Sequence, residues 1–217
     1  MAIASLPSKT GQIRKENEIL ILAAAEQEFA DRGFDGAVMG RIAKRAGLAR
    51  ANIYYYFNSR EQLYWRLLKN IVAKWNESFP DINREDDPAN ILGAYIKAKV
   101  KFSLQNPAAS KIFAGEILRG APIIGEYLED LYGNWLRGRV DVIEAWIQAG
   151  KMDRVDPHHL IFMIWSTTQH YADFDFQVKA ALGKDKYTKE DFHKITSTLT
   201  HIILKGCGIK PLEDAAL

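Results

Sequence analysis

The sequence of 217 residues is poor in cysteine and has no long hydrophobic run. Its single cysteine, Cys207, excludes an intrachain disulfide and a thiolate metal cluster. The longest apolar stretches, such as residues 160–165, are far shorter than the roughly 20 residues that a membrane-spanning helix needs, and the N-terminus lacks the pattern of a signal peptide. We therefore expect a cytoplasmic protein that does not associate with a membrane.

Motifs of common enzyme chemistry are also missing. The sequence has no HExxH zinc motif, no glycine-rich phosphate loop and no nucleophile elbow. His158 and His159, or His170 with Asp173 three residues later, have the types and spacing to ligate a metal or relay protons. A histidine beside an apolar helix face is more often part of a hydrogen-bonded core, so we expect no catalytic residue, no metal site and no cofactor.

No stretch alternates polar and apolar residues for long enough to predict a strand, and helical spacing is found throughout. We therefore expect an all-α chain. In the first predicted helix we expect Ile19, Leu22, Ala23 and Phe29 to be buried and Gly33 to end the helix in the left-handed conformation. The helices are predicted at about 12–32, 38–45, 49–57, 60–79, 89–105, 108–119, 123–149, 158–183 with a break near Asp173, and 189–205.

Acidic residues are absent from residues 36–60, although the net charge of the whole chain is only +2. Tyr54, Tyr55 and Tyr56 are interleaved there with basic residues, as in a surface that contacts phosphates, although a solvated basic face is the alternative. The basic residues of this segment are Arg41, Lys44, Arg45, Arg50 and Arg60.

The two short helices predicted at 38–45 and 49–57 are joined by a tight turn containing glycine, which is typical of a helix-turn-helix unit. Near the start of the second one, Arg50 has the side chain to read guanine and Asn52 the side chain to read adenine. Ile53 and Phe57 should face the core, and we expect Tyr54 to pack rather than contact DNA. The groups suited to phosphates are Tyr55, Tyr56 and Arg60.

Several short motifs together resemble the N-terminal signature of the TetR family of transcriptional regulators, over about residues 12–70. They are Gly33-Phe34, Ile42-Ala43, Ala46-Gly47-Leu48 and the run at 52–63. The resemblance implies a dimer of all-α subunits, each with a three-helix DNA-binding domain and a helical ligand-binding domain, and most often a repressor that a small molecule releases from DNA. It also implies that Arg50 and Ala51 face bases and that Tyr55, Tyr56 and Arg60 hold phosphates.

Two positions depart from the pattern of that family. Ala37 and Ala49 stand where the family usually has hydroxyl residues that cap the second and third helices. Loss of such a cap costs roughly 1 kcal/mol and can remove a phosphate contact. A ligand-binding protein with weakened DNA binding is therefore an alternative to a full regulator.

Residues 156–174 have polar side chains within an otherwise apolar helix. Phe162, Trp165, Gln169 and Asp173 lie three to four residues apart and so share one face. An aromatic platform beside an amide suits a planar lactam or imide such as a pyrimidine base, and internal packing of these groups is the alternative.

This segment also resembles the effector domains of the TetR-family regulators of pyrimidine utilisation, with further matches at residues 116–118 and 120–122. That resemblance implies uracil or thymine as the effector. Arg119 is one of several divergent residues, so a regulator of the same family with another effector is the alternative. The implied pocket residues are Trp75, Trp165, Gln169, Tyr171 and Asp173.

The expected organisation is a disordered basic arm at 1–11, a helix-turn-helix domain at 12–59, an effector-binding and dimerisation domain at 60–209 and a flexible tail at 210–217. The expected partners are a double-stranded DNA operator of near-palindromic sequence, a small-molecule effector and a second copy of the chain. An apolar stripe of Ile195, Leu199 and Ile203 is a candidate dimer contact, or equally part of the core.

Overall fold

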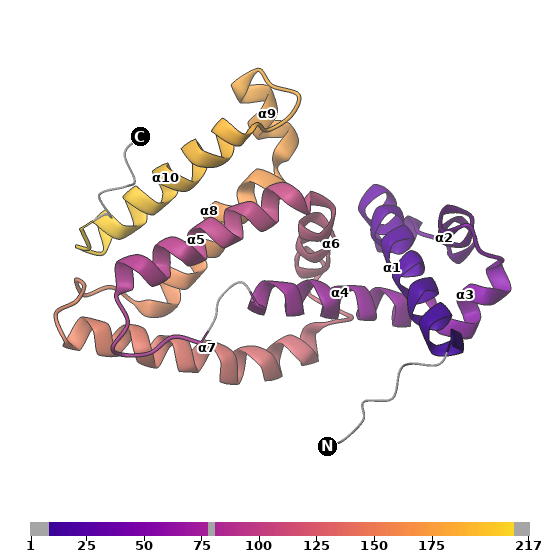
Figure 1. Cartoon of the computed structure of the whole chain (residues 1–217), viewed down its shortest axis with the longest axis horizontal. Helices are drawn as coiled ribbons and strands as arrows, with labels where there is room; N and C mark the ends of the chain where they lie inside the picture. Colours follow the sequence, from indigo (N-terminus) through magenta and orange to yellow (C-terminus); the bar gives the residue numbers. More distant parts are fainter. Residues whose placement is uncertain (1–8, 78–80, 211–217) are drawn as a thin grey trace.

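The computed structural model describes residues 9–77 and 81–210, and side chains from residue 12 onward. The predicted arm at 1–11 and tail at 210–217 lie almost entirely outside the described residues. No strand occurs among the residues that are described, and the prediction of an all-α chain is confirmed (Figure 1). The helices are α1 (Lys9–Gly36), α2 (Met39–Ala46), α3 (Arg50–Tyr56), α4 (Arg60–Glu77), α5 (Pro88–Gln105), α6 (Pro107–Leu118), α7 (Gly125–Gln148), α8 (Pro157–Asp173), α9 (Asp175–Leu182) and α10 (Lys189–Gly206).

Side-chain caps fix the starts of several helices. The carboxylate of Asp87 accepts hydrogen bonds from the backbone N–H groups of the first turn of α5, and that of Asp156 does the same at α8. Thr188 and Asp191 form a reciprocal capping box at α10. At α4, Ser59 Oγ accepts from the backbone N–H of Gln62 at 3.1 Å. These caps satisfy backbone donors that the first turn of a helix otherwise leaves free.

Helix α1 differs from its prediction in two ways. Phe29 is buried as expected and Leu22 is half-buried, but Ile19 and Ala23 are exposed, and Ile21, Ala24 and Ala25 are buried in their place. The reason is that the partners of α1 are α2, α4 and α6, and they cover the face one step around the helix from the predicted one. Gly33 does interrupt the helix, with φ 67° and ψ 177°, but this is not the left-handed helical conformation that we expected.

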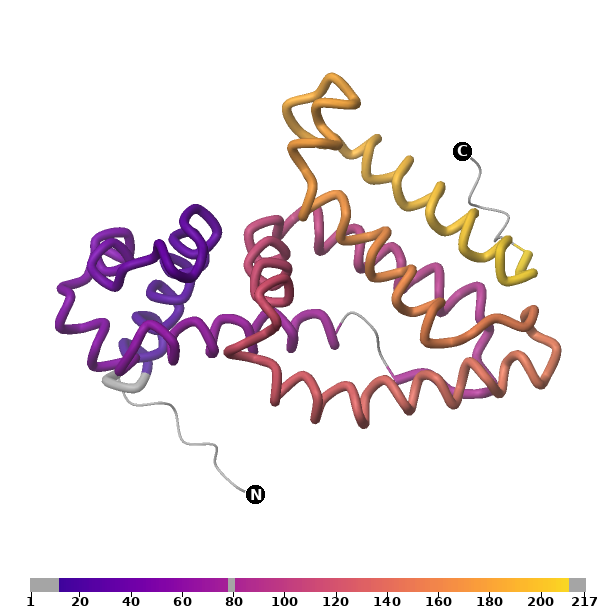
Figure 2. The backbone as a smooth tube through the Cα atoms, turned by 180° about the vertical axis from the view of Figure 1, so that it is seen from behind, coloured from indigo at the N-terminus to yellow at the C-terminus, as the bar shows by residue number. Residues whose placement is uncertain are grey.

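Two clusters of buried side chains hold the chain together. The first joins α1, α2, α3 and α4 to α6 and the beginning of α7. The second joins α5, the rest of α7, α8 and α10. Helix α4 runs out of the helix-turn-helix and ends between α5 and α7, and α6 lies between the N-terminal helices and α5, α8 and α10 (Figures 1 and 2). The N-terminal domain therefore shares its core with α6 and does not end at a clean boundary.

The stripe of α10 that was a candidate dimer contact belongs to the interior. Ile195 and Ile203 are buried in the second cluster, and Leu199 packs against it. Helix α10 packs along α5 and also contacts α8. Of the two alternatives for this stripe, the prediction that it is part of the core is correct.

Within residues 9–77 and 81–210, no helix has both the length and the apolar character needed to cross a membrane. The same residues include no group of three or more His, Cys, Asp or Glu side chains placed to hold a metal ion.

Candidate functional site

Helices α2 and α3 form a helix-turn-helix whose second helix is presented to solvent. Gly47 ends α2 in the left-handed conformation, with φ 68° and ψ 25°, which a residue without a Cβ adopts freely. Ile53 and Phe57 anchor α3 in the core as predicted. The side chains of the first turn of α3, which are Arg50, Ala51 and Asn52, are all exposed.

The three tyrosines of α3 have different environments. Tyr55 is 70% exposed, whereas Tyr56 is partly buried and accepts a hydrogen bond from Asn17 Nδ2 at 3.0 Å. Tyr54, which we expected to pack rather than contact DNA, is 40% exposed, and its ring packs beside Arg50. The guanidinium of Arg50 is 5.7 Å from the Tyr54 ring centroid, and its Nη2 is 3.4 Å from the Tyr54 hydroxyl. Tyr54 thus restrains the side chain of Arg50 on the exposed face of α3.

Part of the basic charge of residues 36–60 is neutralised inside the domain. Arg41 pairs with the buried carboxylate of Glu28, and Arg45 pairs with Asp31 at 3.0 Å. The acidic residues lie on α1, so the sequence of the basic segment did not reveal them. Lys44 and Arg50 remain exposed, and neither has an ion pair within the described part of the chain.

Arg60 has a structural role in this domain. Its Nη1 donates to the carbonyl oxygens of Asp35 and Ala37 at 3.2 and 3.3 Å, and its guanidinium lies 4.3 Å from the centroid of the Phe34 ring. The side chain therefore holds the end of α1 against the start of α4, and a contact with phosphate would use only its remaining donors.

The two alanines that depart from the family pattern differ in position. Ala49 is the N-cap of α3, and no side chain caps the helix there, as expected. Ala37 is not a cap, because the N-cap of α2 is Val38 and Ala37 is completely buried in the first core. A hydroxyl at position 37 would have to be satisfied in that core, so the alanine there is a packing residue.

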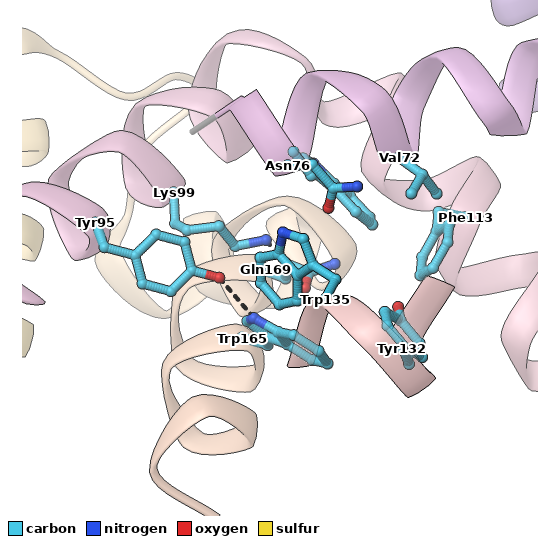
Figure 3. A pocket seen from close by; sticks show the side chains of 10 residues that line it. Val72, Asn76, Tyr95, Lys99, Phe113, Tyr132, Trp135, Trp165 and Gln169 are labelled. Atoms are coloured by element: carbon cyan, nitrogen blue, oxygen red, sulfur yellow. Dashed lines mark hydrogen bonds between the residues drawn. The ribbon is translucent and has the colours of Figure 1, made fainter. Parts of the chain in front are cut away.

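A small cavity of about 40 Å³ lies among α4, α5, α6, α7 and α8 (Figure 3). Aromatic rings form most of its wall, and the polar groups that reach it are two amides, one amine and phenol hydroxyls. The lining residues are Val72, Trp75, Asn76, Tyr95, Lys99, Phe113, Tyr132, Trp135, Trp165 and Gln169.

Trp165 is the centre of the aromatic wall. Its Nε1–H donates to the Tyr95 hydroxyl at 2.6 Å, and its ring centroid lies 5.6 Å from that of Tyr132 and 6.3 Å from that of Trp135. Burial raises the pKa of Tyr95 well above its ordinary value and raises that of Tyr132 to about 12, so both phenols stay protonated at neutral pH. The wall is therefore uncharged and suited to a flat ring.

Lys99 is the only residue of the cavity lining whose side chain can carry a positive charge. It is 3% exposed, its Nζ is 4.5 Å from the centroid of the Trp75 ring, and it is 3.5 Å from Gln169 Oε1. Burial lowers the pKa of Lys99 to about 7, against the weaker opposing effect of the Asp173 carboxylate. Sequence reasoning missed this residue, although Lys99 lies on the buried stripe of α5 with Leu92, Ile96 and Val100.

Half of the predicted effector residues line the cavity. Trp75, Trp165 and Gln169 do so, whereas Phe162 and Tyr171 do not. Phe162 is 43% exposed on the outer side of α8, and Tyr171 contacts Tyr187. Residues three to four positions apart share one face of α8, but that face is longer than the small cavity, so only Trp165 and Gln169 of the face reach it.

Asp173 lies behind the cavity rather than in its lining. Its Oδ1 accepts a hydrogen bond from Ser110 at 2.5 Å, which ties α8 to α6. Burial raises the pKa of Asp173 and the bond from Ser110 opposes this effect.

Helix α6 connects the cavity to the helix-turn-helix. Phe113 lines the cavity, and at the other end of the helix Arg119 lies 4.8 Å from the Phe34 ring at the end of α1. The completely buried carboxylate of Glu116 holds this end of α6, since it pairs with Arg119 at 2.9 Å and accepts from the backbone N–H of Ile123 at 2.7 Å.

The lowered pKa of Lys99 predicts a specific dependence of stability on pH. The folded chain releases this proton above about pH 7, and the unfolded chain keeps it to about pH 10. Between these values the unfolded state binds more protons, so the group makes the free energy of unfolding rise with pH, and its destabilising effect is complete below pH 7. We predict that Lys99→Met removes this rise in urea denaturation curves, whereas Lys97→Met, at an exposed position of the same helix, keeps it. Equal pH slopes for Lys99→Met and the wild type would contradict the burial of a titrating amine.

Comparison with known proteins agrees with this architecture. Residues 21–67 match the family model described as bacterial regulatory proteins, tetR family, and residues 68–210 match the model described as YcdC-like protein, C-terminal region. Among solved structures, a transcriptional regulator of Streptomyces coelicolor, SCO4942, has a TM-score of 0.67 at 23% identity and covers 86% of this chain and 97% of its own. FadR of Bacillus subtilis, solved with stearoyl-CoA, has a TM-score of 0.66 at 18% identity, with 87% and 98% covered. At these identities the likeness concerns the fold.

Two curated relatives are more similar in sequence. The HTH-type transcriptional regulator RutR of Escherichia coli K12 is 36% identical over 190 residues, which cover 86% of this chain and 88% of RutR. The HTH-type transcriptional repressor NicS of Pseudomonas putida KT2440 is 33% identical over 197 residues, with 86% and 90% covered. The relatives are regulators and not enzymes, as expected for this chain. The chain therefore belongs to the TetR family of bacterial transcriptional regulators.

Proposed function

We propose that the chain acts as a dimeric repressor that binds a near-palindromic operator through α3 and leaves it when a small planar effector, uracil or a related pyrimidine, occupies the cavity of Figure 3. The observation that carries the proposal is the combination of Trp165 and Gln169 in that cavity. A tryptophan face can stack on a flat ring, and an amide can pair with the adjacent C=O and N–H groups of a lactam.

Similarity supports the choice of pyrimidines as the first effectors to test. RutR is 36% identical over most of both chains, and the effector half of this chain resembles regulators of pyrimidine utilisation. A family member with another effector is the alternative, because NicS is 33% identical over an equal share of this chain, 86%. The two alternatives differ in the ring that the cavity accepts and agree in the position of the site.

The DNA surface of the proposal comprises exposed residues of α3 with aromatic and basic neighbours. Arg50, Ala51 and Asn52 are placed to face bases, and Tyr55 to reach a phosphate. Tyr56 and Arg60 have bonds within the subunit and would contribute only their remaining hydrogen-bonding capacity.

Arg50→Ala tests this surface. If Arg50 pairs with a guanine, its removal costs about 1–3 kcal/mol of binding free energy and relaxes the preference at one base position. The measurement is fluorescence anisotropy with the DNA upstream of the protein's own gene, compared with scrambled DNA. Arg84→Ala, which removes an exposed arginine from the loop before α5, should bind as the wild type does. Equal losses in the two variants would show that Arg50 supplies only general charge.

The dimer of the proposal would use the outer faces of the last helices. Met163 of α8 is 42% exposed and Ile202 of α10 is 58% exposed, and Phe162 is exposed beside Met163. Exposed apolar side chains gathered on two neighbouring helices are typical of a protein interface.

We predict that Met163→Glu shifts the protein toward monomer in sedimentation velocity, because a carboxylate would be desolvated at the interface. The control is Leu118→Glu, which places the same charge at an apolar position on α6 that is 87% exposed. A dimer unaffected by Met163→Glu would place the interface elsewhere.

Calorimetric titration with uracil and thymine, with adenine as a control, tests the effector directly. The proposal predicts saturable binding at one site per subunit, release of the wild type from its upstream DNA in a gel shift, and loss of both effects in Gln169→Ala. Gln148→Ala, at an exposed position at the end of α7, should behave as the wild type does. Absence of uracil and thymine binding would refute a pyrimidine effector and leave the family assignment intact.

A further inference from the structure

Lys99 is a buried amine without a matching carboxylate. Among the described residues no ion pair to Lys99 lies within 4.0 Å, and the one nearby carboxylate, that of Asp173, is hydrogen-bonded to Ser110. An ammonium group has three donors, and the one hydrogen bond that the structure gives this group is the long contact of 3.5 Å to Gln169 Oε1, beside the cation–π contact of 4.5 Å to the Trp75 ring centroid. Burying a charge with so little compensation is costly.

The other groups around the amine cannot supply the missing negative charge. Tyr95 of α5 and Tyr132 of α7 are phenols that stay protonated. Helices α4 and α6 present Trp75, Asn76 and Phe113, which are uncharged. Asp173 of α8 is therefore the only anionic group that acts on Lys99 among its described neighbours.

The amine of Lys99 points into the cavity that a ligand would occupy. In Figure 3 the side chain of Lys99 extends from α5 toward the middle of the ring of lining residues, between the Tyr95–Trp165 pair and the amide of Asn76. A flat molecule against the tryptophans would meet the amine at its edge. The acceptor that the protein does not provide would then come from the ligand.

We infer that Lys99 determines the specificity of the cavity, which selects planar rings with an edge oxygen that carries full or partial negative charge. Imide oxygens of an acidic ring and aromatic carboxylates belong to this class. The inference rests on the proposed function in taking the cavity as the effector site, and it adds the charge that the effector should present. A hydrogen bond to a charged group is stronger than one between neutral groups, which is the source of the selectivity.

Calorimetric titration with three planar ring compounds tests the inference: uracil, 6-azauracil and benzoate. The ring of 6-azauracil is nearly isosteric with that of uracil but more acidic. The wild type should bind 6-azauracil more tightly than uracil. Lys99→Met should lose about ten- to a hundredfold in affinity for each ring that the wild type binds, and should lose the preference between the two pyrimidines. Lys97→Met, which removes an exposed lysine from the same helix, should retain both.

A second variant separates the effect of charge from that of a damaged fold. Lys99→Gln keeps a donor but has no charge, so it should still bind uracil and no longer prefer 6-azauracil. A preference measured within one variant compares two ligands on the same protein and does not depend on the fraction that is folded. A preference unchanged in Lys99→Gln would overturn the inference.

The remaining outcomes distinguish the inference from the proposed function. Equal affinity of uracil for the wild type and Lys99→Met would overturn the role of Lys99 and leave a pyrimidine effector standing. Binding of benzoate alone, dependent on Lys99, would support the inference and refute the pyrimidine. If the wild type bound none of the three probes, both would be refuted.

Discussion

The arrangement of the molecule depends on the burial of α4 in a core that it shares with both halves of the chain. Leu63, Leu68 and Val72 of this helix are buried in the same cluster as Phe29 of α1 and Ile112 of α6. Because protein interiors are close-packed, a helix held in this way cannot tilt without displacing its neighbours. The position of α3 is consequently linked to the packing of the effector half.

The cavity is lined by the helices that link the position of α3 to the rest of the chain. Val72, Trp75 and Asn76 from the end of α4 line it, and so does Phe113 of α6. The other end of each helix contacts the N-terminal domain. Arg60 at the start of α4 and Arg119 at the end of α6 both place their guanidinium groups over the Phe34 ring of α1. A ligand shifts the equilibrium between two arrangements only if it binds them unequally, and these two helices are the elements through which an unequal affinity would reach α3.

In the part of the chain that the structure describes, the buried carboxylates have ion-pair partners, whereas the buried amine of the cavity does not. Glu28 is matched by Arg41, and Glu116 by Arg119 and two backbone N–H groups, so each carboxylate has local compensation. Lys99 has no paired carboxylate among the described residues, and its compensation is a cation–π contact to Trp75, a long contact to an amide and the field of Asp173. Groups that remain poorly compensated in a packed interior are concentrated at sites where a ligand completes the environment.

The sequence by itself determined the helical class, the helix-turn-helix with its exposed Arg50 and buried Ile53, and the contributions of Trp75, Trp165 and Gln169 to the cavity. Except for Trp75, which came from the family resemblance, these features follow from local periodicity, from turn glycines and from motif spacing, which act over a few residues. Tertiary structure alone decided which face of α1 is buried, that Ala37 is a core residue, that Tyr54 is exposed beside Arg50 and that Phe162 and Tyr171 turn away from the cavity. It also placed Lys99 of α5 beside Gln169 of α8, which is 70 residues away along the chain. Such outcomes depend on which helices meet, and periodicity within one helix carries no information about its partner.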